Sequence, residues 1–418
     1  MLIFYRLLIN IVLILSPFIL IIRILKKKED LKRFKEKYCF FSEKKKNGKL
    51  IWFHGASVGE IQSIVPLLEK LDKNDEIKQI LITSNTLSSS KIVSDFKFKK
   101  VIHQFFPIDT NYLTNRFLNY WKPSAAFFID SEIWPNMISN LNKQKISMTL
   151  LNGRITKKTY KKWKTVNNFS FSIFQKINLC LPANNESQRY LKKLGAKNIK
   201  QIGNLKYSQS ENDKIEINKN LKRFFKSKKI WCASSTHSSE EIFCGIVHKE
   251  LKKKFKNFVT IIIPRHIDRV ALIKAELNNL KLKIHVHEPK KKIPKDLDIY
   301  LINSYGQTKS FYNNCKNVFL GGSLVNHGGQ NPLEATRYGC NILHGPNISN
   351  FKEIYDHLEK MNISKKIINK KTMIDQLHKI FSKNNNSKKI QKKLADIGHK
   401  ILNSTYKEIK FIIKRNEV

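Results

Sequence analysis

The sequence predicts an α/β protein made of two doubly wound parallel-sheet domains preceded by an apolar helix. Three observations support this prediction. Short apolar runs alternate with helical patterns along most of the chain, and one polar stretch near the middle interrupts the alternation. The 418 residues are also too many for one compact core, so two domains of roughly 200 residues each are expected.

The first segment is almost wholly apolar. Residues 2–25 read LIFYRLLINIVLILSPFILIIRIL, and the basic stretch KKKEDLKRFKEK follows. About 20 apolar residues cross a bilayer, although Arg6 and Pro17 weaken a simple span. A cleaved signal peptide is disfavoured because no small-residue cleavage site follows the run. We therefore expect residues 1–25 to be an uncleaved anchor, spanning or interfacial, whose flanking lysines keep the rest of the chain on the cytoplasmic side.

Residues 26–206 are expected to form the first domain. Its apolar runs read as buried strands, and most are followed by a polar loop and a helical pattern. Because the carboxyl ends of parallel strands share one edge of a sheet, ligands are expected at the loops that follow these runs. The predicted strands are residues 49–53, 79–84, 101–107, 125–130, 146–154, 178–184 and 200–204.

A polar stretch, YSQSENDKIEINKNLKRFFKSK at residues 207–228, is predicted to link the two domains. Residues 229–384 then repeat the α/β pattern, and residues 385–418 form a basic helical tail that is able to pack back on the first domain. Two such domains facing a cleft are typical of a GT-B-like glycosyltransferase architecture. The predicted strands of the second domain are residues 229–235, 258–265, 283–288, 298–303, 317–322 and 341–345.

The composition permits an anionic partner without identifying one. The formal net charge is +45, from 78 basic and 33 acidic residues. Such a charge is typical of proteins that act on nucleic acids, anionic membranes or phosphorylated substrates. The excess is spread along a chain rich in Lys, Asn and Ile, so a solvated surface is the competing explanation.

Neither the cysteines nor the histidines indicate a metal site. The six cysteines form no CxxC pair, and several lie inside apolar runs, as buried thiols of a reducing compartment do. The 12 histidines form no HExxH motif and no Cys/His cluster. We therefore expect no structural metal and no cofactor.

Charged residues follow the predicted strands of the first domain. In WFHGASVGE (52–60), Glu60 is either a helix-capping acid with a lowered pKa or a general base that the glycines make accessible to a substrate. In DSEIWPN (130–136), one of the two acids either caps the next helix or acts on a ligand. Arg154 and Lys206 follow later strands and either hold an anion or are surface charges.

The second domain carries sharper signals. SSTHSSEE (234–241) either offers backbone N–H groups to an anion or forms an ordinary capping box. PRH (264–266) ends an apolar strand, where an arginine is expected to face a ligand. FLGGSLVNHGGQNPLEA (319–335) presents a helix start between glycines, which suits a phosphate and a ribose, with Glu334 placed to accept ribose hydroxyls. A plain glycine-rich turn is the alternative. The stretch is neither GxGxxG nor a P-loop, so NAD and ATP are not indicated.

Taken together, these stretches resemble the 3-deoxy-D-manno-octulosonic acid (Kdo) transferase family. The resemblance covers nearly the whole chain, and the motifs follow one another in the family's order. The matching stretches are WFHGASVGE, SEIWPN, NGRIT, GNLKY, SSTHSSEE, PRH, GGSLVNHGGQNPLEA and GPNISNFKEIYDHL. The resemblance implies a GT-B fold and a metal-independent, inverting transfer of Kdo from CMP-Kdo to lipid IVA, the tetraacyl lipid A precursor, at the bacterial inner membrane.

The resemblance also implies roles for single residues. Glu60 matches the base that takes the proton from the acceptor hydroxyl, and Asp130 and Lys206 match groups that stabilise the transition state. Two departures from the family pattern stand out, because Gln307 replaces an acid and Asp130 replaces a longer glutamate. The expected CMP contacts are Pro264, Arg265, Tyr305, Gly306, Gln307, Asn331, Pro332, Leu333 and Glu334.

Two alternatives stay open on the sequence. One is a GT-B transferase that uses a UDP-sugar, against which the base at Glu60 and the PRH stretch argue. The other is a membrane-anchored RNA-binding protein, which the charge suggests. No RNP-type aromatic stretch, KH loop or zinc knuckle is present, so no nucleic-acid partner is expected. The expected partners are CMP-Kdo, the lipid A precursor and the anionic membrane surface.

Overall fold

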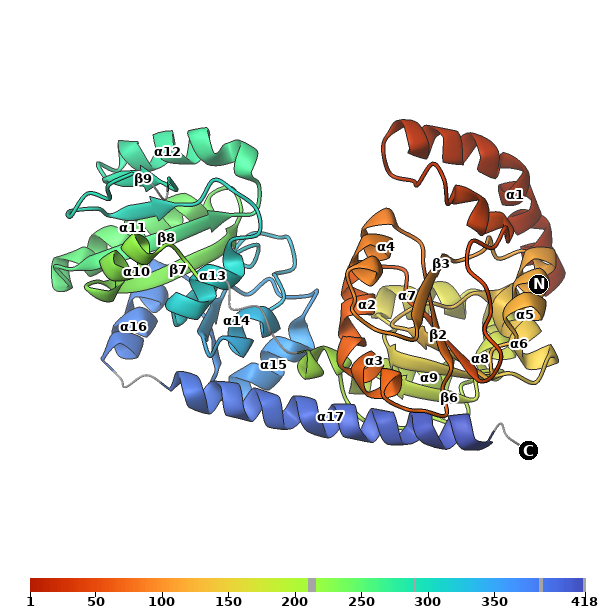
Figure 1. Ribbon diagram of the computed structural model, residues 1–418. Helices are drawn as coiled ribbons and strands as arrows, with labels where there is room; N and C mark the ends of the chain where they lie inside the picture. The colour runs from red at the N-terminus through yellow and green to blue at the C-terminus, as the bar shows by residue number, and fades with distance from the viewer. Residues whose placement is uncertain (210–215, 289–290, 383–385, 416–418) are drawn as a thin grey trace. The chain divides into compact units, whose positions relative to one another are not determined.

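The computed structural model describes residues 1–209, 216–288, 291–382 and 386–415. The chain divides into two compact units, which are considered one at a time (Figure 1). Unit 1 comprises Met1–Gln209 with Ile397–Val418, and unit 2 comprises Ser210–Asp396. All strands pair in parallel and helices connect them, so the predicted α/β fold class is confirmed.

Unit 1 is built on a six-stranded sheet in the order β3-β2-β1-β4-β5-β6. The predicted strand at residues 200–204 is wrong. An isolated bridge joins Cys180 to Ile199, and residues 200–204 form no strand. Gly203, at φ 125°, lies beside Ile401 of α17. The strands are β1 (Leu50–His54), β2 (Gln79–Ser84), β3 (Val101–Phe105), β4 (Ala125–Ile129), β5 (Ser147–Gly153) and β6 (Leu179–Pro182).

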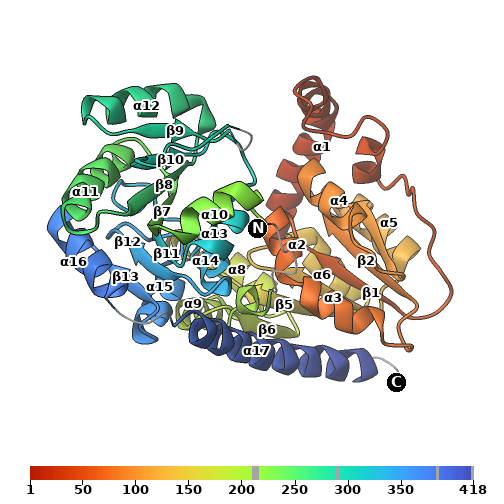
Figure 2. The same ribbon diagram turned by 60° about the vertical axis from the view of Figure 1, so that its left-hand side comes forward.

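Helices surround this sheet (Figure 2). Helices α5, α6, α8 and α9 contribute apolar side chains to a core that also holds Trp52, Phe128 and Leu150 of the sheet. The short 3-10 helices are η1 (Phe34–Tyr38) and η2 (Leu205–Ser208). The helices are α2 (Val58–Ser63), α3 (Val65–Asp72), α4 (Leu87–Ser94), α5 (Asn111–Trp121), α6 (Pro135–Lys143), α7 (Lys157–Lys164), α8 (Asn167–Phe174) and α9 (Asn185–Lys193).

Helix α1 (Leu2–Leu25) is fastened to unit 1 by polar side chains. The Tyr5 hydroxyl donates to Asp109 Oδ2 at 2.8 Å, and Arg6 donates to the side-chain oxygens of Asn136 (3.0 Å) and Asn111 (2.9 Å). Further along, the hydroxyls of Ser16 and Tyr38 lie 2.7 Å apart. Within the described residues, α1 is the one helix that is long and apolar enough to cross a membrane.

Unit 2 is built on a seven-stranded sheet in the order β13-β12-β11-β7-β8-β10-β9. Its six predicted strands are present, five with shorter bounds and β7 one residue longer. The edge strand β13 was not predicted because its sequence, SKK, carries no apolar signal. The strands are β7 (Lys229–Thr236), β8 (Phe258–Pro264), β9 (Ile284–Val286), β10 (Ile299–Leu301), β11 (Asn317–Leu320), β12 (Asn341–His344) and β13 (Ser364–Lys366).

Two apolar cores flank the unit 2 sheet. One includes Tyr300, Phe311 and Tyr355, and the other includes Trp231, Phe258 and Phe319. The six cysteines are buried free thiols, as predicted. The helical segments are α10 (Lys219–Lys226), α11 (Glu240–Lys254), η3 (Ile267–Arg269), α12 (Val270–Asn279), α13 (Thr308–Asn314), α14 (Leu333–Arg337), α15 (Lys352–Lys360) and α16 (Lys370–Phe381).

The predicted linker and tail differ in outcome. Residues 210–215 of the linker lie outside the described residues. The later part is not a linker, because Leu221 and Phe225 of α10 are buried in the core of unit 2. The tail is a long helix, α17 (Ser387–Arg415), whose residues from Ile397 onward belong to unit 1.

Candidate active site

The acids predicted to act in catalysis follow adjacent strands of unit 1. Strands β2 and β3 extend to one side of β1, and β4, β5 and β6 extend to the other, so β1 and β4 flank the topological switch point of the sheet. In open α/β sheets, ligands bind outside the carboxyl ends of the strands at this point. Glu60 follows β1, and both Asp130 and Glu132 follow β4.

Glu60 lies in the first turn of α2 and closes a capping arrangement. Its Oε2 accepts a hydrogen bond from the Ala56 N–H at 2.7 Å, and its Oε1 accepts one from the Ser57 hydroxyl at 2.8 Å. The lowered pKa expected of a capping acid is nevertheless wrong. Burial, followed by the charge of Glu132, raises the pKa of Glu60 to about 7, and the bonds from Ser57 and Ala56 offset only part of this rise. A carboxylate that titrates near neutral pH is suited to accept a proton.

Glu132 is a second acid of this site that sequence reasoning did not single out. Its Oε2 lies 3.1 Å from His54 Nε2 and accepts a hydrogen bond from the Trp134 indole at 2.8 Å. Burial works against ionisation of Glu132, but the hydrogen bonds from His54 and Trp134 and the charge of His54 outweigh it and lower the pKa of Glu132. One feature of the sequence could have indicated a polar partner: His54 is a polar residue at the end of the otherwise apolar strand LIWFH.

Asp130 and Lys206, for which the resemblance implied a role in catalysis, lie in contact with each other. Lys206 Nζ donates to Asp130 Oδ2 at 3.4 Å, and the Asn152 amide donates to Asp130 Oδ1 at 2.6 Å. Asn152 in turn accepts from the Leu205 N–H at 3.0 Å, which ties the loop that carries Lys206 to β5. Asp130 and Asn152 both have left-handed backbones, at φ 57° and φ 53°. Among non-glycine residues Asp and Asn enter this region most readily, which gives a backbone reason for the shorter acid at position 130.

Neither acid of DSEIWPN caps helix α6, so that alternative is wrong for both. The buried carboxylate of Asp109, from the loop after β3, performs this role. It accepts hydrogen bonds from the backbone N–H groups of Asn136 (3.0 Å) and Met137 (2.8 Å), in addition to the one from Tyr5. Burial raises the pKa of Asp109 to about 7 despite these bonds. Helix α1 and the start of α6 therefore share one carboxylate.

In unit 2, one of the two expectations for SSTHSSEE is wrong. Ser239, at φ 74°, precedes α11 without a side-chain cap, so there is no capping box. The other, an anion bound by its backbone N–H groups, stays a prediction, and the buried carboxylate of Glu240 already binds one of these groups. Its Oε2 accepts from the N–H groups of His237 (2.9 Å) and Gly322 (2.7 Å), and its Oε1 accepts from those of Ser323 (3.1 Å) and Leu324 (2.9 Å). Glu240 thus fastens together the loops that follow β7 and β11.

The residues predicted to contact CMP lie at the carboxyl ends of strands of unit 2 or in the segments that follow them. Pro264 is the buried last residue of β8, and the exposed Arg265 follows it, donating its backbone N–H to Thr236 O at 2.9 Å. Tyr305 is 63% exposed, and Gly306, at φ 80°, has open space beside it. Gln307 is the N-cap residue of α13.

The glycine-rich stretch ends at the short helix α14. Pro332 is its N-cap residue, so a helix does start in this stretch, and Leu333 is fully buried. Asn331 Oδ1 accepts from the Leu333 N–H at 3.1 Å, while Glu334 lies partly exposed in the first turn. Gly328 and Gly329 have φ of 95° and 74°, conformations that favour glycine.

Three histidines gather beside these loops, although their spacing in the sequence did not reveal it. The ring centroids of His237 and His327 lie 4.3 Å apart, and those of His237 and His266 lie 6.0 Å apart. Burial, followed by the charge of His327, lowers the pKa of His237. Imidazole N–H groups can donate to a phosphate, so this cluster adds donors near the predicted nucleotide contacts.

Known proteins resemble this chain over most of its length. A family model described as 3-deoxy-D-manno-octulosonic-acid transferase (kdotransferase) matches residues 32–209. The 3-deoxy-D-manno-octulosonic acid transferase of Rickettsia bellii is 31% identical over 376 residues, which cover 88% of each chain. The enzyme of the same name from Haemophilus influenzae is 26% identical and covers 84% of this chain and 83% of its own.

Among solved structures, the fold resembles that of the UDP-GlcNAc 2-epimerase from Neisseria meningitidis bound to UDP-GlcNAc. The TM-score is 0.57 at 13% identity, over 88% of this chain and 100% of the epimerase. A likeness at this identity concerns the fold alone. It agrees with a GT-B-like architecture of two parallel-sheet domains.

Proposed function

Because this chain belongs to the 3-deoxy-D-manno-octulosonic acid transferase family and is a glycosyltransferase, we propose that it transfers Kdo from CMP-Kdo to lipid IVA. The observation that carries the proposal is the 31% identity to the Rickettsia bellii enzyme over 88% of both chains. The grouping of Glu60, Asp130 and Lys206 at one sheet edge supports it. An alternative, transfer from a UDP-sugar, rests only on a likeness of fold.

In the proposed mechanism, Glu60 is the general base. It accepts the proton of the acceptor hydroxyl as the oxygen attacks the anomeric carbon of Kdo. The new C–O bond forms while the bond from that carbon to the CMP phosphate oxygen breaks, and CMP leaves with the bonding electrons. A single displacement of this kind inverts the anomeric centre.

We propose that side chains of the protein, without a metal ion, stabilise the negative charge that develops in the transition state. Lys206, held by Asp130, stabilises negative charge in the transition state. The phosphate of CMP is bound by Arg265 with donors from the histidine cluster, and the ribose by Glu334. Gln307 retains the backbone N–H through which a loop residue can contact the nucleotide, although it has no carboxylate.

We expect the variant Glu132→Gln to shift the acid side of the activity profile to lower pH. The charge of Glu132 is one cause of the raised pKa of Glu60, so its removal lowers that pKa. A base works only when deprotonated, and activity therefore falls as the pH drops through its pKa. For the wild type this fall should be centred near pH 7.

The measurement is kcat/KM against pH for the wild type and Glu132→Gln. The variant Glu186→Gln, which alters an acid in the first turn of α9, is the control and should keep the wild-type profile. An acid limb at the same pH in Glu132→Gln would contradict the coupling between the two carboxylates.

Helix α1 is proposed to lie in the plane of the cytoplasmic face of the inner membrane. Its polar ties to unit 1 include Tyr5 and Arg6, Ser16, and Arg23, which donates to the buried Glu29. These ties divide the helix into stretches of at most nine residues, and nine residues of α-helix extend roughly 14 Å. A bilayer core is about 30 Å thick, so no stretch between two ties is long enough to cross it. The large positive charge of the chain favours an anionic surface.

A transferase assay tests the proposed function. Purified full-length protein is incubated with lipid IVA and CMP-Kdo generated in situ, and the lipid is analysed by mass spectrometry. We expect a mass gain of one or more Kdo units. No gain with intact CMP-Kdo, together with consumption of a UDP-sugar in a parallel reaction, would instead support the alternative transferase. Salt-sensitive RNA binding without any transfer would support the RNA-binding alternative.

A further inference from the structure

A groove of about 510 Å³ lies between helix α1 and the carboxyl edge of the unit 1 sheet. This volume falls within the range of small-molecule sites, roughly 300–1,000 Å³. The walls come from α1, from η1 and from the loops that follow β2, β3 and β4. The residues that line the groove include Ile9, Val12, Lys37, Phe106, Pro107 and Trp134.

The groove borders the apolar face that α1 exposes. Val12 lines the groove and is also 43% exposed, so one side chain belongs to both surfaces. A hydrocarbon chain leaving a bilayer beside α1 could therefore enter the groove while staying in contact with apolar side chains. The exposed apolar residues of α1 include Ile3, Phe4, Leu7, Ile11, Ile14, Leu15, Phe18, Ile21 and Ile22.

Two cations share one carboxylate at the wall of the groove. Arg23 and Lys37 both line it, and both donate to the same atom, Glu29 Oε1, at 2.6 Å. The three side chains together carry one net positive charge. Glu29 is buried, and its other oxygen has no hydrogen-bond partner among the described residues. An anionic group bound beside Arg23 and Lys37 would complement this surplus charge.

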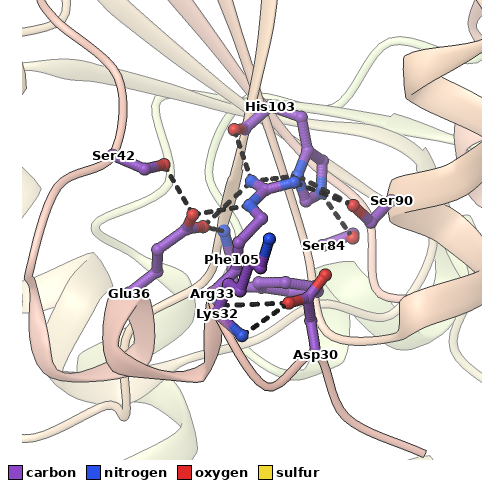
Figure 3. Close-up of polar contacts among 9 residues, drawn as sticks. All are labelled: Asp30, Lys32, Arg33, Glu36, Ser42, Ser84, Ser90, His103 and Phe105. Atoms are coloured by element: carbon purple, nitrogen blue, oxygen red, sulfur yellow. Dashed lines mark hydrogen bonds and ion pairs between the residues drawn. The ribbon is translucent and has the colours of Figure 1, made fainter.

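A partly buried network fastens Arg33 and Glu36, which precede Lys37 in the chain, to the edge strand β3 (Figure 3). Arg33 donates to both oxygens of Glu36, at 2.6 and 3.0 Å, and to the backbone oxygen of His103 at 2.8 Å. Glu36 in turn accepts from the Phe105 N–H at 2.7 Å. Burial and then the charge of Arg33 lower the pKa of His103 to about 3, so the ring is neutral and can accept from Arg33. Lys37 follows directly on this anchored pair.

Trp134 connects the groove to the catalytic acids. Its ring is one wall of the groove and lies 5.2 Å from that of Phe106, centroid to centroid. Its indole N–H donates to Glu132, whose charge acts on Glu60. A molecule in the groove thus lies beside the loop that positions these acids.

We propose that the groove binds one acyl chain of the lipid acceptor, with a phosphate of the same molecule facing Arg23 and Lys37. This assignment rests on the proposed function, because it takes a phosphorylated glycolipid as the acceptor. The proposed occupant of the groove is the lipid acceptor itself. A phospholipid of the surrounding bilayer is the competing outcome of the test.

The first test fills the groove. We expect Ile9→Trp to raise the KM for lipid IVA at least about tenfold while kcat stays within about twofold, because the larger side chain competes for acyl-chain space and the base is untouched. The matched control is Ile14→Trp on the outer face of α1, where the native side chain is 71% exposed. The control should retain the wild-type KM, and both variants should sediment with anionic vesicles as the wild type does.

The second test does not depend on turnover. Wild-type protein is photolysed with lipid IVA that carries a diazirine in one acyl chain, and the labelled residues are identified by mass spectrometry. We expect labelling at Phe106, Pro107 or Trp134. Labelling confined to outer-face residues such as Ile14 and Phe18 would overturn the proposal. So would equal labelling of the groove by a diazirine phosphatidylglycerol that lipid IVA does not displace.

Different results would contradict the acyl-chain site and the proposed Kdo transfer. Normal Kdo transfer with an unchanged KM in Ile9→Trp and no labelling of the groove would overturn the acyl-chain site alone. Absence of transfer by the wild type would overturn the proposed function, and photolabelling would still report whether the groove holds an acyl chain.

Discussion

Glu60→Gln should lower kcat for Kdo transfer by about 100-fold or more, since general base catalysis contributes roughly 10²–10⁴-fold. The amide has the size of the carboxylate but cannot accept the proton. Its oxygen can still accept from the Ala56 N–H, so the first turn of α2 should stay in place. The measurement is initial rates with saturating CMP-Kdo and lipid IVA, beside calorimetric titration with CMP, whose affinity should not change.

A matched control separates loss of the base from loss of charge. Glu69→Gln alters an exposed acid of α3 in the same unit, and its kcat should stay at the wild-type value. If Glu60→Gln instead kept a kcat within about threefold of the wild type, the proton would have to go to another group. Asp130 would then be the next acid to test.

Glu240→Gln should destabilise unit 2 by about 3 kcal/mol. The native carboxylate accepts four backbone hydrogen bonds in a buried position. Glutamine keeps one oxygen, but its NH₂ group would face two N–H donors, and each buried unsatisfied donor costs about 1–3 kcal/mol. For a domain of this size, such a loss lowers Tm by roughly 6–12 °C.

The measurement is differential scanning calorimetry of the full-length protein. Glu250→Gln on the same helix is the control, because Glu250 forms an exposed pair with Lys253, a kind of contact worth at most about 1 kcal/mol. An unfolding transition of Glu240→Gln that coincides with the wild-type transition would show that the loops after β7 and β11 do not need this carboxylate.

The fold could be predicted wherever burial leaves a continuous apolar run. Strands such as β4 and β8 are buried on both faces, so nearly every residue in them is apolar and the pattern is unmistakable. The two errors have a common cause. Residues 200–204 look like a strand but follow the single bridge at Ile199 without pairing, and β13 is a strand without apolar residues at the sheet edge. In both places tertiary contacts override the local pattern.

The candidate catalytic site could be predicted only in part. Glu60, Asp130 and Lys206 follow from the resemblance, and the last two do meet. Glu132 was one of two candidate acids and was not singled out, because its contact is with His54, which lies 78 positions earlier in the chain. The direction of the pKa shift of Glu60 depends on the same distant acid, and no local spacing reveals it.

The docking of α1 has a consequence for the order of events during synthesis. Tyr5 and Arg6 leave the ribosome early, but their partners Asp109, Asn111 and Asn136 follow 104, 105 and 130 positions later. Since domains fold as their chain emerges, α1 must wait, apolar and unpaired, until most of the unit 1 sheet exists. A nascent helix that had already passed through the bilayer could not return Arg6 to Asn136. Helix α1 is therefore made before its partners but takes its place only after they have followed.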